Sequence, residues 1–148
     1  MNLDSLYQEV ILDHYKNPLH KKLVPEPAIQ VHHVNTSCGD EITLNLHFSN
    51  GVVNEISWDG TGCSISQASV SVMSELLQGK SENEAVAILD EFVDVMQSKG
   101  SKSGNESTLG DGIAFAGVSK FPARVKCALL GWMAFKDALM QVKEKGSA

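Results

Sequence analysis

Within residues 3–15, mostly apolar side chains recur at the spacing of one face of an α-helix. The positions that follow the i, i+3, i+4, i+7 rule are Leu3, Leu6, Tyr7, Val10, Ile11, His14 and Tyr15. They predict an amphipathic helix, which the Asn-Pro pair at 17–18 ends. Two further prolines, Pro25 and Pro27, predict an extended connector over residues 19–28.

Apolar and polar residues then alternate with the period of a β-strand. Over residues 42–48, Ile42, Leu44, Leu46 and Phe48 share one face, and the other face is polar. A strand over 29–37 precedes this segment and one over 52–58 follows it. The Asn-Gly pair at 50–51 between the last two is typical of a type I′ hairpin turn, because both of its central positions need positive φ. These features predict a three-stranded antiparallel sheet with one face left for helices to cover.

Helical spacing returns after the strands. We predict a helix over 64–78 and a second one that starts with a capping box, in which Ser81 and Glu84 satisfy each other's backbone N–H groups. Residues 97–117 hold five glycines among short polar residues and predict a long loop. Pro122 fits the first turn of a long C-terminal helix that ends near Gly146. The predicted fold class is α+β, a three-stranded antiparallel sheet packed against a layer of helices.

Length and charge limit what the chain can be. Its 148 residues suit one domain with a hydrophobic core, so we treat 1–148 as a single domain. The net charge is −6 and the lysines are scattered, so we expect no nucleic-acid partner. The first residues lack the basic and apolar segments of a signal peptide, and no stretch is apolar enough to span a bilayer. With unpaired thiols, this predicts a cytoplasmic protein without a membrane partner.

The candidate chemistry is concentrated at three cysteines and one carboxylate. Cys38 stands at a predicted strand end, two residues before Asp40. Cys63 directly precedes a predicted helix, where free N–H groups favour a thiolate, and Cys127 lies early in the last helix. Three thiols and a carboxylate form the ligand set of a four-coordinate zinc or iron site. The odd number of cysteines argues against a disulfide framework, and the alternative is that they are small buried hydrophobic residues.

The position of Cys127 on its helix bears on that choice. At about 100° per residue, Cys127 points away from the apolar stripe of this helix, which we assign to Val125, Leu129, Trp132, Leu139 and Met140. It shares a different face with Leu130 and Ala134, which favours a shared metal site over core packing. Arg124 lies on the same side of the helix and could offset the charge of the thiolates, or it could be a solvated helix residue.

Other polar residues give weaker signals. The histidines lack the spacing of a metal-binding pair, and His47 is expected to meet solvent on the polar strand face. The serines that follow Cys63 suggest helix capping and surface positions; they are Ser64, Ser66, Ser69 and Ser71. Lys120 and Lys126 are expected to be surface charges.

Four long motifs resemble one known family. Residues 6–18, 35–40, 60–66 and 117–127 contain all three cysteines and resemble the U-type iron–sulfur cluster assembly proteins, specifically their SufU branch. The resemblance covers nearly the whole chain. It implies a fold in which a three-stranded antiparallel sheet packs against helices.

The resemblance also implies a chemistry. It places a tightly bound zinc ion on Cys38, Asp40, Cys63 and Cys127, with Cys38 as the persulfide acceptor. The sulfur donor would be a pyridoxal-phosphate cysteine desulfurase of the SufS type. In such proteins a histidine of the donor takes one zinc position, which frees the acceptor cysteine. Downstream iron–sulfur assembly machinery would then receive the sulfur.

A related branch leaves an alternative. The IscU-like scaffolds would assemble a transient [2Fe–2S] cluster on Cys38, Cys63 and Cys127 and pass it to apo-proteins. Scaffold sequences have a histidine before the third cysteine, where this chain has Lys126, and SufU-like sequences have an insertion that residues 97–117 fit. The proline-containing chaperone motif of scaffolds is not cleanly matched over 121–126. We therefore interpret the chain as a zinc-dependent sulfurtransferase, with the cluster scaffold as an alternative and a zinc-stabilised interaction module as a third interpretation.

Overall fold

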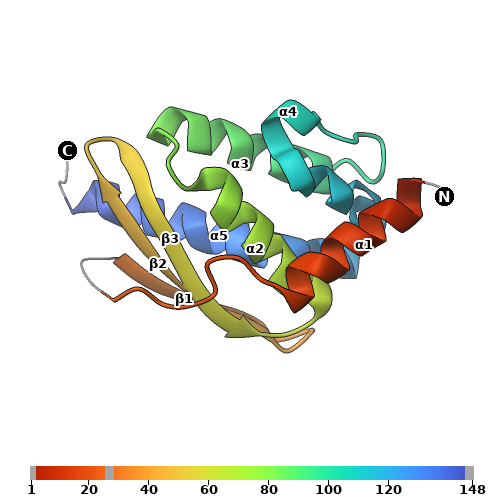
Figure 1. Cartoon of the computed structure of the whole chain (residues 1–148), viewed down its shortest axis with the longest axis horizontal. Coiled ribbons are helices and arrows are strands. Elements are labelled where there is room, and N and C mark those ends of the chain that lie inside the picture. The colour runs from red at the N-terminus through yellow and green to blue at the C-terminus, as the bar shows by residue number, and fades with distance from the viewer. Residues whose placement is uncertain (1–2, 26–28, 146–148) are drawn as a thin grey trace.

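The computed structural model describes residues 3–25 and 29–145. Its elements come in the order expected from the pattern, with helices at both ends of the chain and the strands grouped near the start (Figure 1). In chain order they are α1 (Leu3–Lys16), β1 (Ile29–Asn35), β2 (Asp40–Ser49), β3 (Val52–Thr61), α2 (Ser64–Leu77), α3 (Glu82–Met96), α4 (Glu106–Leu109), the 3-10 helix η1 (Gly110–Lys120) and α5 (Pro122–Glu144). The predicted α+β class is confirmed.

The three strands form one antiparallel sheet in the order β1-β2-β3. Asn50 and Gly51 have φ angles of 53° and 72°, as the predicted type I′ turn requires. β3 ends at Thr61, whereas the predicted strand ended at residue 58. The additional residues continue the ladder with β2, since Gly60 pairs with Ile42 and Thr61 pairs with Glu41. This extension carries the chain directly to the start of α2 beside the first residue of β2.

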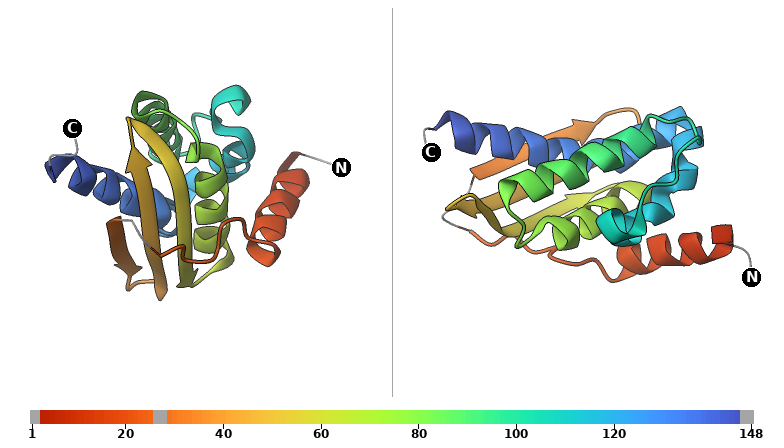
Figure 2. Two further views of the ribbon diagram at one scale, coloured as in Figure 1. Left: turned by 60° about the vertical axis from the view of Figure 1, so that its left-hand side comes forward. Right: turned by 90° about the horizontal axis from the view of Figure 1, so that it is seen from above.

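The helices cover one face of the sheet, and α5 lies against β1 and β2 (Figure 2). α2 packs on both α5 and β3, and α3 also packs on α5. The fully buried side chains between these layers include Leu44 and Trp58 of the sheet. Phe92 of α3 stacks on Trp132 of α5 with ring centroids 4.2 Å apart. The core therefore lies on both sides of the long C-terminal helix.

This central position corrects our interpretation of the faces of α5. Cys127 and Ala134 are fully buried, whereas Met140, which we assigned to the apolar stripe, is 53% exposed. A helix that contacts a sheet on one side and other helices on the other is apolar around most of its circumference. The position of Cys127 away from Val125 therefore does not distinguish a metal ligand from a core residue.

The predicted loop over residues 97–117 is only partly a loop. Residues 106–120 form α4 and the 3-10 helix η1, whose packing buries Leu109 and Phe115 completely. The apolar residues among the glycines supply the contacts that order this segment. The preceding part is tied to α3, because the backbone N–H of Asn105 donates to Glu91 over 2.8 Å.

The serines of α2 were assigned wrongly to the surface. Ser66, Ser69 and Ser71 are at most 1% exposed, and only the partly buried Ser64 resembles the expectation. Ser69 donates a 2.6 Å hydrogen bond to the carbonyl oxygen of Ala128 and accepts one from the Trp132 indole over 2.9 Å. Small hydroxyl side chains therefore let α2 and α5 pack closely while their own polar groups stay paired.

The N-terminal helix α1 is held by one buried histidine. Nδ1 of His14 lies 2.8 Å from the Ser71 hydroxyl in α2, and Nε2 lies 2.8 Å from the Asp111 carboxylate in η1. The predicted helix is confirmed, but two residues of its expected apolar face, Leu6 and Tyr15, are 46% and 44% exposed. Over the residues that the structure describes, no helix combines the length and apolarity needed to cross a membrane.

Candidate metal centre

Asp40 is the firmly held carboxylate of the candidate site. It is the first residue of β2 and is completely buried. Its Oδ1 accepts a 2.8 Å hydrogen bond from the backbone N–H of Cys63, and its Oδ2 lies 3.8 Å from the Cys63 sulfur. Gly62 makes this approach possible, since its φ is 146° and a Cβ there would lie 2.2 Å from Oδ1. The site therefore depends on a glycine directly before the second cysteine.

Cys63 is the N-cap residue of α2, as its position before a helix predicted. Its sulfur accepts a hydrogen bond from the backbone N–H of Ser66 over 3.5 Å. The hydroxyl of Ser66 donates to the carbonyl oxygen of Cys63 over 3.1 Å. An N–H group at a helix N-terminus favours an ionised sulfur, so this position suits a metal-binding thiolate.

Cys38 lies on a turn between the first two strands. We expected it at the end of the first strand, but β1 ends at Asn35, residues 36–39 form the turn and Asp40 already belongs to β2. Gly39 turns the chain with a φ of 71°. Cys38 is exposed, and its sulfur lies 3.1 Å from that of Cys127.

Cys127 is the buried member of the group. Its sulfur lies 3.6 Å from the carbonyl oxygen of Ala123. Burial raises the pKa of the Cys127 thiol far above its usual range, and the neighbouring Cys38, Asp40 and Cys63 raise it further. Without a cation, this sulfur therefore keeps its proton, and a metal ion that binds here has to displace that proton.

The structure brings the predicted ligands together. Single ligand atoms of Cys38, Asp40 and Cys127 all lie within 4.8 Å of one another. Cys63 is outside this closest group but touches it through Asp40. Three sulfurs with one carboxylate fit the preference of zinc for thiolate ligands in a four-coordinate site. Among the described histidines, none belongs to the group.

Arg124 is exposed at the start of α5, one turn before Cys127. Within residues 3–25 and 29–145, its side chain has neither a hydrogen bond nor an ion pair. Its proposed role in offsetting the charge of the thiolates stays a prediction. Arg124 also lines a groove of about 1000 Å³ between α1, η1 and the first turns of α2 and α5.

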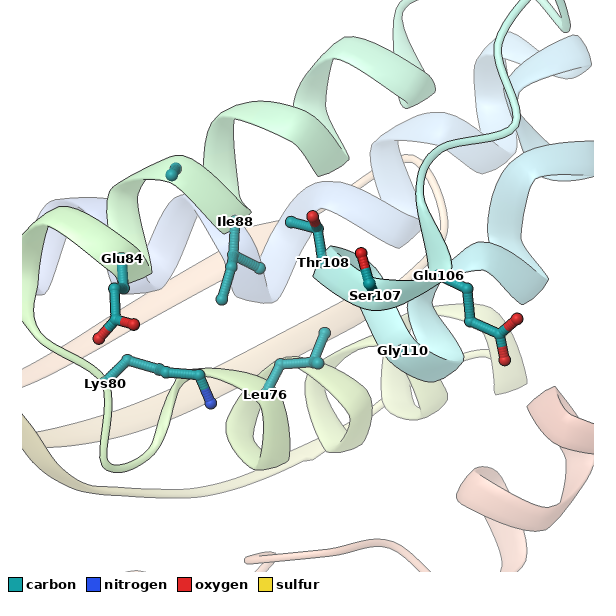
Figure 3. Close-up of a pocket in the computed structure, with 9 residues that line it drawn as sticks. Leu76, Lys80, Glu84, Ile88, Glu106, Ser107, Thr108 and Gly110 are labelled. Carbon is teal, nitrogen blue, oxygen red and sulfur yellow. The ribbon is translucent and has the colours of Figure 1, made fainter.

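A second pocket lies elsewhere, between α2, α3 and α4 (Figure 3). It has a volume of about 330 Å³ and is lined by residues that include Lys80, Glu84 and Ser107. No residue of the candidate metal site lines it. The candidate ligands lie apart from this pocket, at the end of the sheet where the β1–β2 turn, β2, α2 and α5 meet.

Sequence reasoning missed the polar contacts of two residues, Asn35 and His33. Asn35 bonds both to the turn that carries Cys38 and to the sulfur of Cys127. His33 of β1 reaches Asp137 of α5 over 2.9 Å. An asparagine at a strand end followed by Thr-Ser is a signal for a side-chain-capped turn, so Asn35 could have been found from the sequence.

Comparison with known proteins identifies the class. The sequence profile of the NifU-like N terminal domain matches residues 6–145. The zinc-dependent sulfurtransferase SufU of Bacillus subtilis is 43% identical over 145 residues, which cover 98% of this chain and 95% of that protein. The iron–sulfur cluster assembly scaffold protein IscU of Streptococcus pyogenes is 40% identical over 138 residues, which cover 93% and 84%.

Solved structures share the fold. FiSufU of Fervidobacterium islandicum superposes with a TM-score of 0.82 at 34% identity, covering 93% of this chain and 99% of that one. The N-terminal part of a NifU-like protein of Brucella abortus gives a TM-score of 0.83 at 27% identity, covering 97% and 98%. The chain therefore belongs to the NifU N-terminal-domain family of iron–sulfur cluster assembly proteins. Within that family it is a SufU-type member, as the resemblance implied.

Proposed function

We propose that this protein is a zinc-dependent sulfurtransferase of iron–sulfur cluster biogenesis that accepts persulfide sulfur through Cys38. One observation carries the proposal: the ligands differ sharply in exposure. Asp40 and Cys127 are fully buried, whereas Cys38 lies on an exposed turn. A large sulfur donor can therefore reach Cys38 while the other ligands stay anchored in β2, α2 and α5.

The residues that would hold zinc are Cys38, Asp40, Cys63 and Cys127. When bound, the ion would keep the coordinated sulfurs ionised at neutral pH, which supplies the nucleophilic form of a thiol. Asp40 contributes a charge and also fixes Cys63 through the 2.8 Å hydrogen bond to its backbone N–H. This double role makes Asp40 and Cys63 one rigid unit, which suits ligands that are retained throughout the reaction.

The transfer step is an exchange between a thiolate and a persulfide. The Cys38 thiolate attacks the terminal sulfur of the donor persulfide and forms a new sulfur–sulfur bond. The bond between the two donor sulfurs breaks, and the donor cysteine leaves as a thiolate. Cys38 then carries the extra sulfur, with no net oxidation or reduction. We propose a pyridoxal-phosphate cysteine desulfurase of the SufS type as donor, iron–sulfur assembly machinery as recipient, and the cytoplasm as location.

The test is cysteine-dependent sulfide production by a SufS-type desulfurase with and without the zinc-loaded protein. Wild-type protein should accelerate the reaction strongly, and Cys38→Ala should abolish the acceleration. Ser37→Ala, on the same exposed turn, serves as the matched control and should retain it. Full acceleration by Cys38→Ala would remove Cys38 as the acceptor. If Cys38→Ser also kept its function in cells, the protein would be a zinc-stabilised interaction module.

A second candidate function is the transient assembly of a [2Fe–2S] cluster. The similarity to IscU of Streptococcus pyogenes and the convergence of the three thiols favour it. Anaerobic reconstitution with iron and sulfide tests it directly. A stable brown protein with visible absorbance that depends on Cys38, Cys63 and Cys127 would support a scaffold. A colourless product that retains zinc would support sulfur transfer.

A further inference from the structure

Asn35 connects the backbone of the exposed turn that carries Cys38 with the thiol of the buried Cys127. It is the last residue of β1, is half-buried and stands opposite Asp40 in the strand register. Four residues separate these partners, and they form the turn that contains Cys38. Asn35 is therefore the point at which the reactive turn joins the sheet.

Two hydrogen bonds fix the turn to Asn35. Its side-chain Oδ1 accepts from the backbone N–H of Ser37 over 3.2 Å, and its backbone carbonyl oxygen accepts from the N–H of Cys38 over 3.3 Å. The first of these is the bond of an Asx-turn, in which an asparagine side chain replaces a backbone acceptor. Asn35 thus sets the path of the backbone from which the Cys38 thiol projects.

The other end of the same amide faces Cys127. Nδ2 of Asn35 donates to the Cys127 sulfur over 3.9 Å. The orientation of the amide follows from chemistry, because only its oxygen can accept from the Ser37 N–H, and this leaves the NH₂ group toward the sulfur. Asn35 therefore supplies the Cys127 sulfur with an N–H donor, whereas the sulfur of Cys38, within the described residues, accepts only from the Cys127 thiol. That thiol loses its proton when a metal binds.

We propose that Asn35 is a positioning residue that makes Cys127 the retained ligand and Cys38 the reacting one. A hydrogen-bonded thiolate shares its lone pair with the donor, so it is better stabilised and less nucleophilic than a free one. This inference rests on the proposed sulfur transfer for its functional meaning. The hydrogen bond to the Cys127 sulfur can be tested without any sulfur donor.

The test uses cobalt(II) in place of zinc, because its sulfur-to-metal charge-transfer bands report on the coordinated sulfurs. Asn35→Ser keeps an oxygen that can accept from Ser37 but is too short to reach Cys127. Asn35→Asp also keeps the turn acceptor but puts a carboxylate oxygen in place of the donor. Asn54→Asp, on the exposed part of β3 near the hairpin, makes the same charge change away from the site.

Both Asn35 variants should shift the charge-transfer bands to longer wavelength and weaken cobalt binding about tenfold, the usual size of such outer-sphere effects. Asn54→Asp should match the wild type. In the desulfurase assay, Asn35→Ser should accept sulfur more slowly than the wild type. An unchanged spectrum and affinity in Asn35→Ser would overturn the inference, even if Asn35→Asp failed to fold. A wild-type protein that never accelerates the desulfurase would instead refute the proposed function.

Discussion

At the scale of single residues, Gly62 determines how closely the backbone before Cys63 approaches Asp40 in the candidate metal site. Its φ of 146° and the 2.2 Å gap between a built Cβ and Asp40 leave no room for a side chain. We predict that Gly62→Ala displaces the Asp40 carboxylate and lowers zinc affinity at least about tenfold, as loss of ligand orientation does elsewhere. Competition with a chromogenic chelator measures this affinity.

The matched control for that prediction is Gly117→Ala. Gly117 has nothing within 4 Å of a built Cβ and no positive φ, so the substitution adds a methyl group in open space. This variant should bind zinc like the wild type. Equal affinities of Gly62→Ala and the wild type would show that Asp40 does not need its observed position to bind the metal.

At the same scale, residue type indicated the candidate ligands but not the residues that position them. Cys38, Cys63 and Cys127 stand out because cysteine is rare. Cys38 and Cys63 also adjoin a glycine, and Cys127 lies early in the last helix. Asn35 and the buried serine Ser69 did not stand out, because asparagine and serine are also common at exposed turns and helix surfaces. The turn that Asn35 caps has a local signal, but the contact of Asn35 with Cys127 and the contacts of Ser69 involve residues that are distant in sequence.

At the scale of elements, His14 should decide how firmly α1 is attached. His14→Ala removes contacts to Ser71 of α2 and Asp111 of η1, and it leaves the buried Ser71 hydroxyl with one partner fewer. We predict a loss of about 1–3 kcal/mol in the free energy of unfolding, the cost of an unpaired buried polar group. The amides of α1 should also exchange faster in hydrogen-exchange measurements.

His32→Ala is the control for this helix attachment. His32 is exposed on β1, and its Nδ1 bonds to Thr43 of the neighbouring strand over 2.8 Å. The variant should leave the exchange of the α1 amides unchanged. If both histidine variants altered α1 to the same extent, the attachment would not depend on the His14 contacts.

The contact between His33 of β1 and Asp137 of α5 predicts that the stability of the protein depends on pH. A hydrogen bond from His33 lowers the pKa of Asp137, and one from Gln141 lowers it further. A carboxyl group with a lowered folded-state pKa stabilises the protein above its unfolded pKa, near 3.9, and this contribution is lost as the pH falls through the folded value. The stability of the wild type should therefore fall more steeply than that of Asp137→Asn on acidification below about pH 4.

Denaturant unfolding of the two proteins at several pH values measures this difference. A His33→Ala background is the control, because it removes the first cause of the shift. In that background, stability plotted against pH should differ less between the proteins with and without Asp137→Asn. Parallel curves for the wild type and Asp137→Asn in the original background would contradict the proposed link between β1 and α5.

At the scale of the whole molecule, the metal site joins segments that are distant in sequence. The candidate ligands come from the β1–β2 turn, β2, the residue before α2, and α5. We predict that removing zinc with a chelator lowers the melting temperature and that added zinc restores it. Zinc at 100 times its dissociation constant contributes about 2.7 kcal/mol when only the folded state binds it. An unchanged melting temperature would show that metal binding does not stabilise the folded state.

The same scale separates what the sequence could predict from what it could not. Strand alternation and the hairpin turn are local, so the sheet was predicted within a few residues at its ends. The burial of Cys127 is not local, because it depends on the sheet and the helices that pack on opposite sides of α5. The order of η1 is not local either, because it depends on contacts with α1, α3 and α5. Periodicity along one helix cannot show how many of its faces are covered.

The most direct test of sulfur transfer is to locate the sulfur itself. The zinc-loaded protein is incubated with cysteine and a SufS-type desulfurase, alkylated, digested and mapped by mass spectrometry. We predict one additional sulfur atom on the peptide that contains Cys38 and none on those that contain Cys63 or Cys127. Sulfur found on Cys127, or on no cysteine while the desulfurase turns over, would contradict the assignment of Cys38 as the acceptor.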